Sequence, residues 1–267
     1  VFTVDSDNCT NANSQTYVAY LFAGGESTAA TARSVDFDRS GDYLKLGASS
    51  DFSFGTGDFT IEAWVKTEDV SVYQGIFQLS SNSNGIDPSN GISMQYKGSN
   101  SRFQIWKDNP SGGGIHTVYS SSPTKLPKDQ WYHVAYVKYN NVSTLYVNGV
   151  KEVSEADTAN YTYQNLAIGG FYDTTMLWKG GISNFRVVKG TAVYTSSFKP
   201  PTEPLTNITN TKLLCCNNSS TTGSTVTPGT ITANGDPTAS TNSPFDDPAG
   251  FVFGDAGDQN VIKCGSY

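Results

Sequence analysis

Apolar and polar positions alternate along most of the chain, most clearly between Trp131 and Val153. Residues 131–139 carry bulky, largely apolar side chains at odd and even positions alike. Successive side chains on a strand point to opposite faces, so both faces of this strand need cover. Asn148 and Gly149 supply the two positive-φ positions of a type I′ turn, which closes a hairpin around them. The stretch therefore predicts an inner strand and a hairpin of a β-sandwich.

The same two-residue period recurs in short runs that are separated by Gly, Asn, Asp and Ser. No helical periodicity lasts longer than a turn or two. Many short alternating strands between turns are typical of sandwiches and jelly rolls, so the predicted fold class is an all-β, antiparallel jelly roll. The runs are 35–46, 59–65, 75–79, 92–96, 102–106, 115–119, 165–169 and 181–188.

Four segments follow from this pattern. Residues 34–216 are expected to form the jelly roll, with the Pro-rich part of 195–205 running extended across its surface. Residues 217–247 are rich in Ser, Thr, Asn, Gly and Pro and predict a linker. Residues 1–33 and 248–267 each hold one short apolar run, and we interpret them as two parts of one flanking β module into which the middle is inserted.

The composition narrows the class of protein. Charged residues make up 15% of the 267 residues and aromatic residues 12%, a balance typical of all-β extracellular or virion proteins. The net charge of -7, with no Lys/Arg cluster, argues against binding to nucleic acid or anionic membrane. No apolar run reaches the roughly 18 residues that a membrane helix needs. The chain begins with Val1 and shows no signal peptide, so we expect a processed or excised piece of a longer protein.

The four cysteines are Cys9, Cys215, Cys216 and Cys264, and their spacing fits neither a zinc site nor a disulfide-rich scaffold. Two interpretations remain open. The cysteines are free buried thiols, or Cys9 and Cys264 form a bridge that joins the two ends. Mass measurement with and without reductant separates the two.

Five motifs carry a resemblance to a known family. In order, they are FTIEAWV at 59–65, WYHV at 131–134, LYVNG at 145–149, IG at 168–169 and GGISNFRV at 180–187. Over 34–205 the chain resembles the laminin-G-like jelly rolls of the concanavalin A-like lectin/glucanase superfamily. The segment 189–205 looks like the variant found in large structural proteins of marine bacteriophages. Residues 16–23 and 261–267 are similar to pieces of a repeat in phage tail-fibre and virion proteins, which implies location in a virion.

Glycosidases of this superfamily need two carboxylates, about 5 Å apart, on one strand face. Here Glu62 has Thr60 and Trp64 as its neighbours on the same face and no second acid. His116 and His133 have no Cys or Ser neighbour arranged as in a catalytic triad. We therefore expect Glu62 to be a polar partner within the sheet, and the chain not to be an enzyme.

The resemblance also implies a calcium ion near the first and last strands, bound by hard oxygen ligands. Asp38 and Asp42 flank the first predicted turn and are the candidate ligands. Ser183 stands where the family usually has an Asp, and Asn184 follows where an acid is common. The alternative is that both aspartates only form the turn.

A sugar offers apolar C–H faces and a rim of hydroxyls, so its binding site combines an exposed aromatic ring with amides and carboxylates. Trp106 precedes a polar, Gly-rich loop, and Trp178 lies just before the last predicted strand. The alternative is that both tryptophans only cover the edges of the sandwich. The candidate ligand-binding residues are Tyr73, Asn84, Asp87, Asn90, Trp106, Asp108, Asn109, Tyr172, Asp173 and Trp178.

Two functions of different classes follow. The first is adhesion, in which the loops of a phage tail fibre or appendage contact host-surface polysaccharide, weakly at each site and strengthened by several copies in a homo-oligomer. The second is a structural or capsid-decoration module whose loops contact other virion subunits. Loss of glycan binding on substituting Trp106 or Trp178 favours adhesion, whereas a large apolar subunit interface over the same loops favours the structural role.

Overall fold

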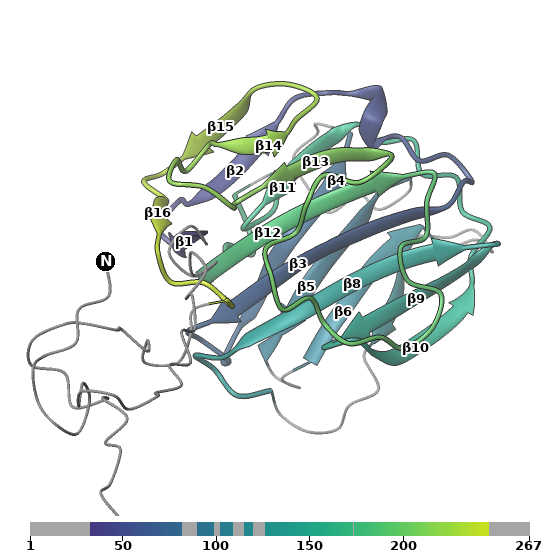
Figure 1. The fold of residues 1–267 in the computed structure, drawn as a ribbon, viewed down its shortest axis with the longest axis horizontal. Coiled ribbons are helices and arrows are strands. Elements are labelled where there is room, and N and C mark those ends of the chain that lie inside the picture. The colour runs from purple at the N-terminus through teal and green to yellow at the C-terminus, as the bar shows by residue number, and fades with distance from the viewer. Residues whose placement is uncertain are drawn as a thin grey trace, which may run out of the picture.

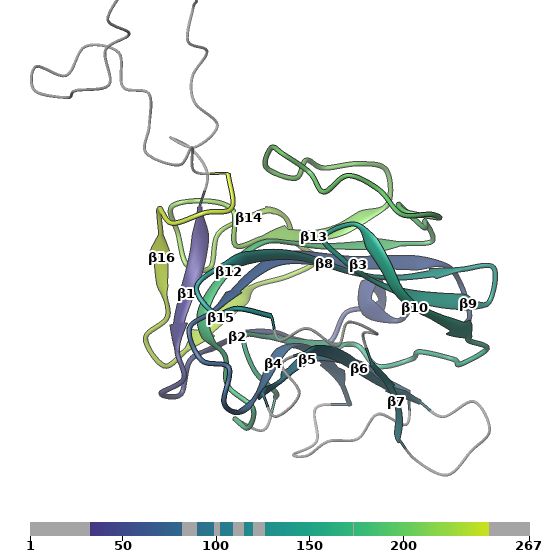
Figure 2. The same cartoon turned by 90° about the horizontal axis from the view of Figure 1, so that it is seen from below.

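The computed structural model describes residues 33–81, 90–98, 102–108, 115–119, 126–172 and 174–245. These residues form two antiparallel sheets that pack face to face (Figures 1 and 2), so the predicted all-β sandwich of the jelly-roll type is confirmed. Within them, no helix has the length and apolar character needed to cross a membrane. The predicted flanking module, Cys9 and Cys264 lie outside the described residues.

Among the described residues, one sheet has nine strands and the other has seven, and a single 3-10 turn, η1, spans Ser50–Phe52. The nine-stranded sheet has the order β10 (Val150–Ala156), β9 (Val142–Val147), β8 (Trp131–Tyr139), β3 (Phe59–Thr67), β12 (Lys179–Lys189), β1 (Ser34–Asp38) and β16 (Thr238–Ser240), with β13 (Thr211–Cys215) on β12 and β14 (Ser224–Val226) on β13. The seven-stranded sheet has the order β15 (Ile231–Asn234), β2 (Tyr43–Leu46), β11 (Asn165–Ile168), β4 (Tyr73–Ser80), β5 (Ile92–Lys97), β6 (Arg102–Asp108) and β7 (Ile115–Tyr119).

Strand β8 is covered on both faces, as its two apolar sides predict. Val134 and Tyr136 are buried in the main core between the sheets. On the outer face, Ala135 packs in a separate cluster with Tyr194 and Phe198, whose rings are stacked with centroids 3.6 Å apart. These two rings belong to the segment 190–206, which joins β12 to β13 and passes over β8, β9 and β10 without forming a strand (Figure 1). We name this segment the strap.

The hairpin between β9 and β10 fixes the position of the strap. Asn148 and Gly149 have φ angles of 49° and 74°, which are the positive values that a type I′ turn requires. The carbonyl of Gly149 accepts a hydrogen bond from the Phe198 amide at 2.9 Å. A Cβ atom on Gly149 would lie 1.9 Å from the Phe198 carbonyl oxygen, so only glycine fits beneath the strap here.

The predicted linker over 217–247 is wrong for its described part, 217–245, which contains three strands. β14 pairs with β13, β15 with β2, and β16 with β1. These strands are short and at most partly buried apart from Ile231, which lies opposite Leu46 and provides an apolar anchor in β15. Because β15 and β16 lie at sheet edges, their stability comes from pairing with the strand beside them, and the sequence shows no apolar alternation there.

Cys215 and Cys216 are both buried and free, as the first interpretation of the cysteines predicts for this pair. The hydrogen bond with the adjacent Cys216 thiol, followed by burial, raises the pKa of Cys215 well above its ordinary value, so the thiol stays protonated.

Candidate functional site

Trp106 lies on the outer face of the seven-stranded sheet. Its neighbour Ile105 is buried in the core between the sheets, so Trp106, one residue on, points away from the core. Across the sheet, Trp106 is paired with Ser93 of β5, and Ser93 is paired with Gln78 of β4. These register positions place the tryptophan beside a row of polar side chains that face away from the core.

The loop that leads from β11 to β12 brings two more rings to this face. Phe171 is buried, and its ring atoms lie 2.7 Å from where a Cβ on Gly75 would be. Its ring meets that of Trp106 edge-on, with centroids 6.2 Å apart. The amide of Tyr172 donates to Gln78 Oε1 at 2.9 Å, which holds the next ring over the sheet. Trp106, Phe171 and Tyr172 together form what we name the aromatic strip.

Both ends of the aromatic strip are partly exposed, while Phe171 between them is buried. Lys45 Nζ lies 5.0 Å from the centroid of the Tyr172 ring, a cation–π contact that adds a charged donor to this end. Burial, followed by the nearby Tyr43, raises the pKa of Tyr172, so its hydroxyl stays neutral. The strip therefore presents two fixed rings with a hydroxyl and an ammonium group beside them.

The other predicted ligand-binding residues are distributed more widely. Tyr73 lies at the start of β4 with 38% of its surface exposed, and Lys97 Nζ is 5.5 Å from its ring centroid. The carbonyl of Asn90 accepts hydrogen bonds from the amides of Thr162 and Tyr163, so the main chain of Asn90 has a structural role. Asp108 is the last residue of β6. Asn84, Asp87, Asn109 and Asp173 lie outside the described residues.

The expectation that Trp178 forms an exposed platform is wrong. Its side chain is fully buried and belongs to the main core, and its amide donates to the Gly169 carbonyl at 2.9 Å. Trp178 directly precedes β12 and lies four residues before Ile182, which faces the core, so the two-residue period of the strand, continued backwards by one residue, points Trp178 the same way. For the burial of Trp178, its spacing from Ile182 is therefore a better guide than its nearness to a loop.

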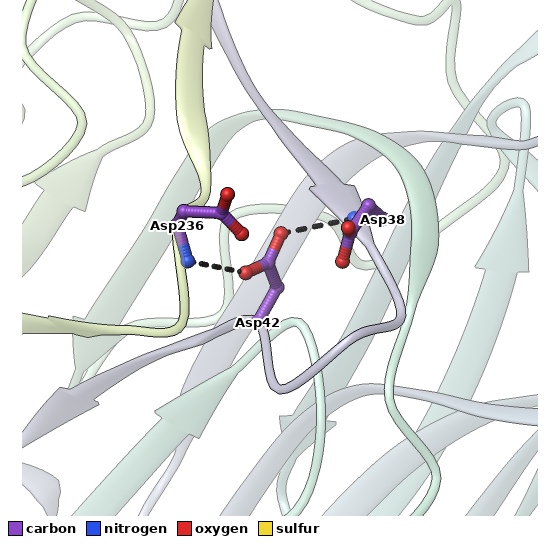
Figure 3. A group of neighbouring side chains, drawn as sticks. All are labelled: Asp38, Asp42 and Asp236. Carbon is purple, nitrogen blue, oxygen red and sulfur yellow. Dashed lines mark hydrogen bonds between the residues drawn. The ribbon is translucent and has the colours of Figure 1, made fainter.

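Asp38 and Asp42 do lie together, and the structure adds Asp236 (Figure 3). One carboxylate oxygen from each lies within 4.8 Å of the others. Asp42 is buried, and its two oxygens accept hydrogen bonds from the amides of Asp38 at 3.0 Å and Asp236 at 2.7 Å. No sequence pattern points to Asp236, because it lies in the segment that is predicted to be a linker.

The environment of Asp42 suits a cation. Burial raises the pKa of Asp42, and the carboxylates of Asp38 and Asp236 act in the same direction against the two main-chain hydrogen bonds. Calcium takes oxygen ligands at about 2.3–2.6 Å, so oxygens of one coordination shell lie within about 5 Å of each other, and the three carboxylates fit. The same hydrogen bonds also let Asp42 tie the turn after β1 to the turn after β15. Both roles predicted for these aspartates are therefore compatible with the geometry.

Glu62 is a buried polar partner, as predicted. Its carboxylate accepts hydrogen bonds from Arg186 at 2.6 and 2.8 Å and from the Tyr194 hydroxyl at 2.8 Å, and it lies 3.0 Å from His133 Nε2. Burial by itself would raise the pKa of Glu62, but the His133 hydrogen bond and the Arg186 charge outweigh it and lower the pKa. The carboxylate is thus ionised, satisfied and covered by the strap.

A second buried network lies between the sheets and was not foreseen. Lys107 Nζ of β6 lies 2.7 Å from Glu155 Oε1 and 3.2 Å from Asp157 Oδ2, while Lys138 Nζ donates to the Ala159 carbonyl at 3.0 Å. Both lysines are fully buried. Because Lys107 lies in one sheet and Glu155 in the other, their ion pair joins the two sheets, and the buried charge of Lys107 is balanced by carboxylates.

A comparison with known protein families gives a match for most of the sandwich. The family model described as the concanavalin A-like lectin/glucanases superfamily matches residues 38–193. Among curated proteins, no sequence matches the chain.

Solved structures with a similar fold include three of low sequence identity. A putative carbohydrate binding protein from Bacteroides ovatus is 16% identical, with a TM-score of 0.54 over 79% of this chain and 60% of that chain. A heptameric SAP-like pentraxin from Limulus polyphemus is 18% identical, with a TM-score of 0.46 over 62% and 79%. Domain 4 of an extracellular arabinanase from Geobacillus stearothermophilus, in complex with arabinotriose, is 20% identical, with a TM-score of 0.47 over 60% and 72%. With its two packed sheets and the family match over more than half its length, the chain belongs to the concanavalin A-like lectin/glucanases superfamily.

Proposed function

We propose that this domain is a non-catalytic carbohydrate-binding module whose ligand lies on the aromatic strip. The observation that carries the proposal is the pair of partly exposed rings, Trp106 and Tyr172, held in place by the buried Phe171 between them. Fixed aromatic surfaces pack on the C–H faces of a sugar at low entropic cost. The Lys45 ammonium and the Tyr172 hydroxyl beside them are donors suited to the hydroxyl rim.

The likeness to the Bacteroides ovatus structure, described as a putative carbohydrate binding protein, supports this use of the fold. The state of Glu62 supports a module without catalysis. A general acid or nucleophile needs access to the substrate, whereas Glu62 is buried beneath the strap and paired with Arg186 and His133.

We further propose that the module is carried by a phage virion, in a tail fibre or appendage outside the cell, where it contacts host-surface glycans. The resemblance of 189–205, 16–23 and 261–267 to phage structural proteins supports this location. Several copies in a homo-oligomer would raise the apparent affinity of weak sites without any new contact.

Glycan-array binding, followed by calorimetry on the best ligand, tests the proposal. Trp106→Ala and Tyr172→Ala are each expected to weaken binding by about tenfold, which corresponds to the upper range of an aromatic contact. Trp106→Phe retains a ring and is expected to keep part of the affinity. Val150→Ala, at the exposed first residue of β10, is the control and is expected to bind as the wild type does.

Undiminished binding by a folded Trp106→Ala/Tyr172→Ala double variant would contradict the proposed site. If no glycan binds and the strip instead contacts other virion subunits, the structural role is the better account.

A further inference from the structure

The outer face of the nine-stranded sheet carries a hollow lined in part by aromatic rings, about 240 Å³ in volume. It lies between the strands β8, β9 and β10 on one side and the strap on the other. Its lining includes Tyr139, Val142, Thr144, Tyr146, Tyr194 and Thr195. Because the aromatic strip lies on the other sheet and also faces outward, the hollow and the strip occupy opposite faces of the sandwich.

The floor and one wall of the hollow are rigid. Tyr146 has only 2% of its surface exposed and belongs to the cluster beneath the strap. Tyr194 stacks on Phe198, and its hydroxyl donates to Glu62, so both ends of this side chain are fixed. The Tyr146 and Tyr194 ring centroids are 6.5 Å apart. A pocket with such fixed rings needs no ordering when a ligand enters.

The opposite wall is open and apolar. Tyr139, at the end of β8, has 46% of its surface exposed, and Val142, its partner across the turn, has 41%. These are two of the few large hydrophobic side chains that are exposed among the described residues. An exposed apolar pair beside a polar-rimmed hollow is characteristic of a binding surface.

The rim of the hollow supplies hydrogen-bonding groups. The hydroxyls of Thr144 and Ser154 are 2.9 Å apart, and each keeps further donor or acceptor capacity. The lining also includes Asn140 and Lys151. Amide, hydroxyl and ammonium groups around aromatic rings match a ring-shaped ligand with apolar faces and a hydroxyl edge.

We propose that this hollow is a second carbohydrate-binding site, for a single pyranose ring. The volume supports one ring, since pockets for drug-sized ligands are larger, at about 300–1,000 Å³. The inference rests on the proposed function, because it assigns to the same domain a second sugar contact. Two sites on opposite faces make each copy bivalent, able to join two glycan chains and to gain apparent affinity from doing so.

Other hollows in the described part of the chain fit a sugar less well. One of about 360 Å³ is lined by Lys45–Ser49, Pro228–Thr230 and Thr232, and none of these side chains is aromatic. Another, beside Trp131, has only about 60 Å³ and includes Asp36, Lys66 and Glu68. Of these three hollows of the described residues, only the one beside the strap combines rings, an open wall and room for a pyranose.

Amide-resolved NMR titration of the whole 267-residue chain tests the proposal. The probes are the methyl glycosides of glucose, galactose, mannose and N-acetylglucosamine, each added separately. We expect at least one to shift the amide signals of Tyr139, Thr144 and Tyr194. Tyr139→Ala is expected to weaken this binding about two- to tenfold, Tyr139→Phe to retain it, and the control Val150→Ala to leave it unchanged.

The outcomes separate the two sites. Shifts around Tyr139 that persist in Trp106→Ala and need about two- to tenfold more glycoside in Tyr139→Ala support the second site. Shifts around the aromatic strip alone, with none around Tyr139 for any glycoside, overturn the second site and leave the proposed function standing. Shifts around Tyr139 alone support the hollow and show that the strip is not a sugar site.

Discussion

Glu62 and Asp42 are both buried carboxylates, yet their surroundings are opposite. Glu62 is surrounded by hydrogen-bond donors and the guanidinium of Arg186. Asp42 accepts two main-chain hydrogen bonds, and the side chains that act on it through charge are the acids Asp38 and Asp236. The pKa of Glu62 is accordingly lowered and that of Asp42 raised.

The charges around a buried carboxylate thus distinguish one with a structural role from one that can bind a cation. The charge of Glu62 is already balanced by Arg186, so an added cation would find no favourable electrostatic interaction there. Among the described residues the three aspartates form no ion pair with a basic side chain, so a divalent cation would relieve the repulsion of Asp42 by Asp38 and Asp236. The same side-chain chemistry thus has two uses, decided by what the fold places around it.

Breaking the ion pair between Glu62 and Arg186 is expected to change the free energy of unfolding the most. Arg186→Met leaves Glu62 buried without its guanidinium and is expected to lower the free energy of unfolding by about 3–5 kcal/mol. Urea denaturation measures this change. The double variant Glu62→Met/Arg186→Met removes both charges and is the control; it is expected to be more stable than the single variant. Equal loss in both would show that packing, not charge, holds this site.

Calcium is the next test, on the Asp42 side. Calcium at a hundred times its dissociation constant would stabilise the fold by about 2.7 kcal/mol, and a chelator would reverse the gain. Thermal melting with calcium and with chelator measures it. The double variant Asp38→Asn/Asp236→Asn is expected to lose the response while keeping the main-chain hydrogen bonds to Asp42. A melting temperature that changes with neither calcium nor chelator would mean that the aspartates only stabilise turns.

The pH dependence of stability also distinguishes Glu62 from Asp42, with a smaller expected effect. The folded pKa of Glu62 lies below its ordinary value of 4.5, so its contribution is present above that value and is lost as pH falls through the folded pKa. The difference in unfolding free energy between the wild type and Glu62→Gln should therefore narrow from about pH 6 to about pH 3. Denaturant titrations across this range measure it, and a constant difference would contradict the assignment.

The smallest effect is expected from Asp236→Asn without calcium. Asp42, with its raised folded pKa, stabilises the fold at low pH, and this contribution is lost as pH rises above 3.8. Removing one neighbouring charge should therefore raise stability at neutral pH, by about 0.2–1 kcal/mol. Glu203→Gln, an exposed acid in the strap, is the control. The gain should vanish at acid pH, and a gain that persists there would have another cause.

Periodicity was enough to predict the inner strands, because burial on both faces leaves bulky residues at every position of β8. The Asn148–Gly149 turn was equally readable, since few residues tolerate two successive positive φ angles. The edge strands β15 and β16 were not, because polar strands are stabilised by main-chain pairing that leaves no apolar pattern. Missing them also hid Asp236, which only the pairing of β16 with β1 and of β15 with β2 brings to Asp42.

The candidate sugar site was predictable in part. Trp106 and Tyr172 were named from the sequence, but their meeting through Phe171 depends on how the loop after β11 folds over β4. Trp178 is buried because it lies an even number of residues before the core-facing Ile182, and its place beside a loop does not reveal this. The hollow under the strap could not be foreseen, since it depends on where a segment without strands crosses β8 and β9.

The pairing of β1 with β16 has a mechanical consequence. Ser34 opposes Ser240, so the domain's first strand begins where its last one ends, and the chain enters and leaves at one corner. A force that pulls the two flanking segments apart would act on this pair of strands first. The hydrogen bonds between β1 and β16 would then break one after another, starting at Ser34 and Ser240. Single-molecule stretching should show that the β1–β16 pair separates at low force, before the rest of the sandwich unfolds.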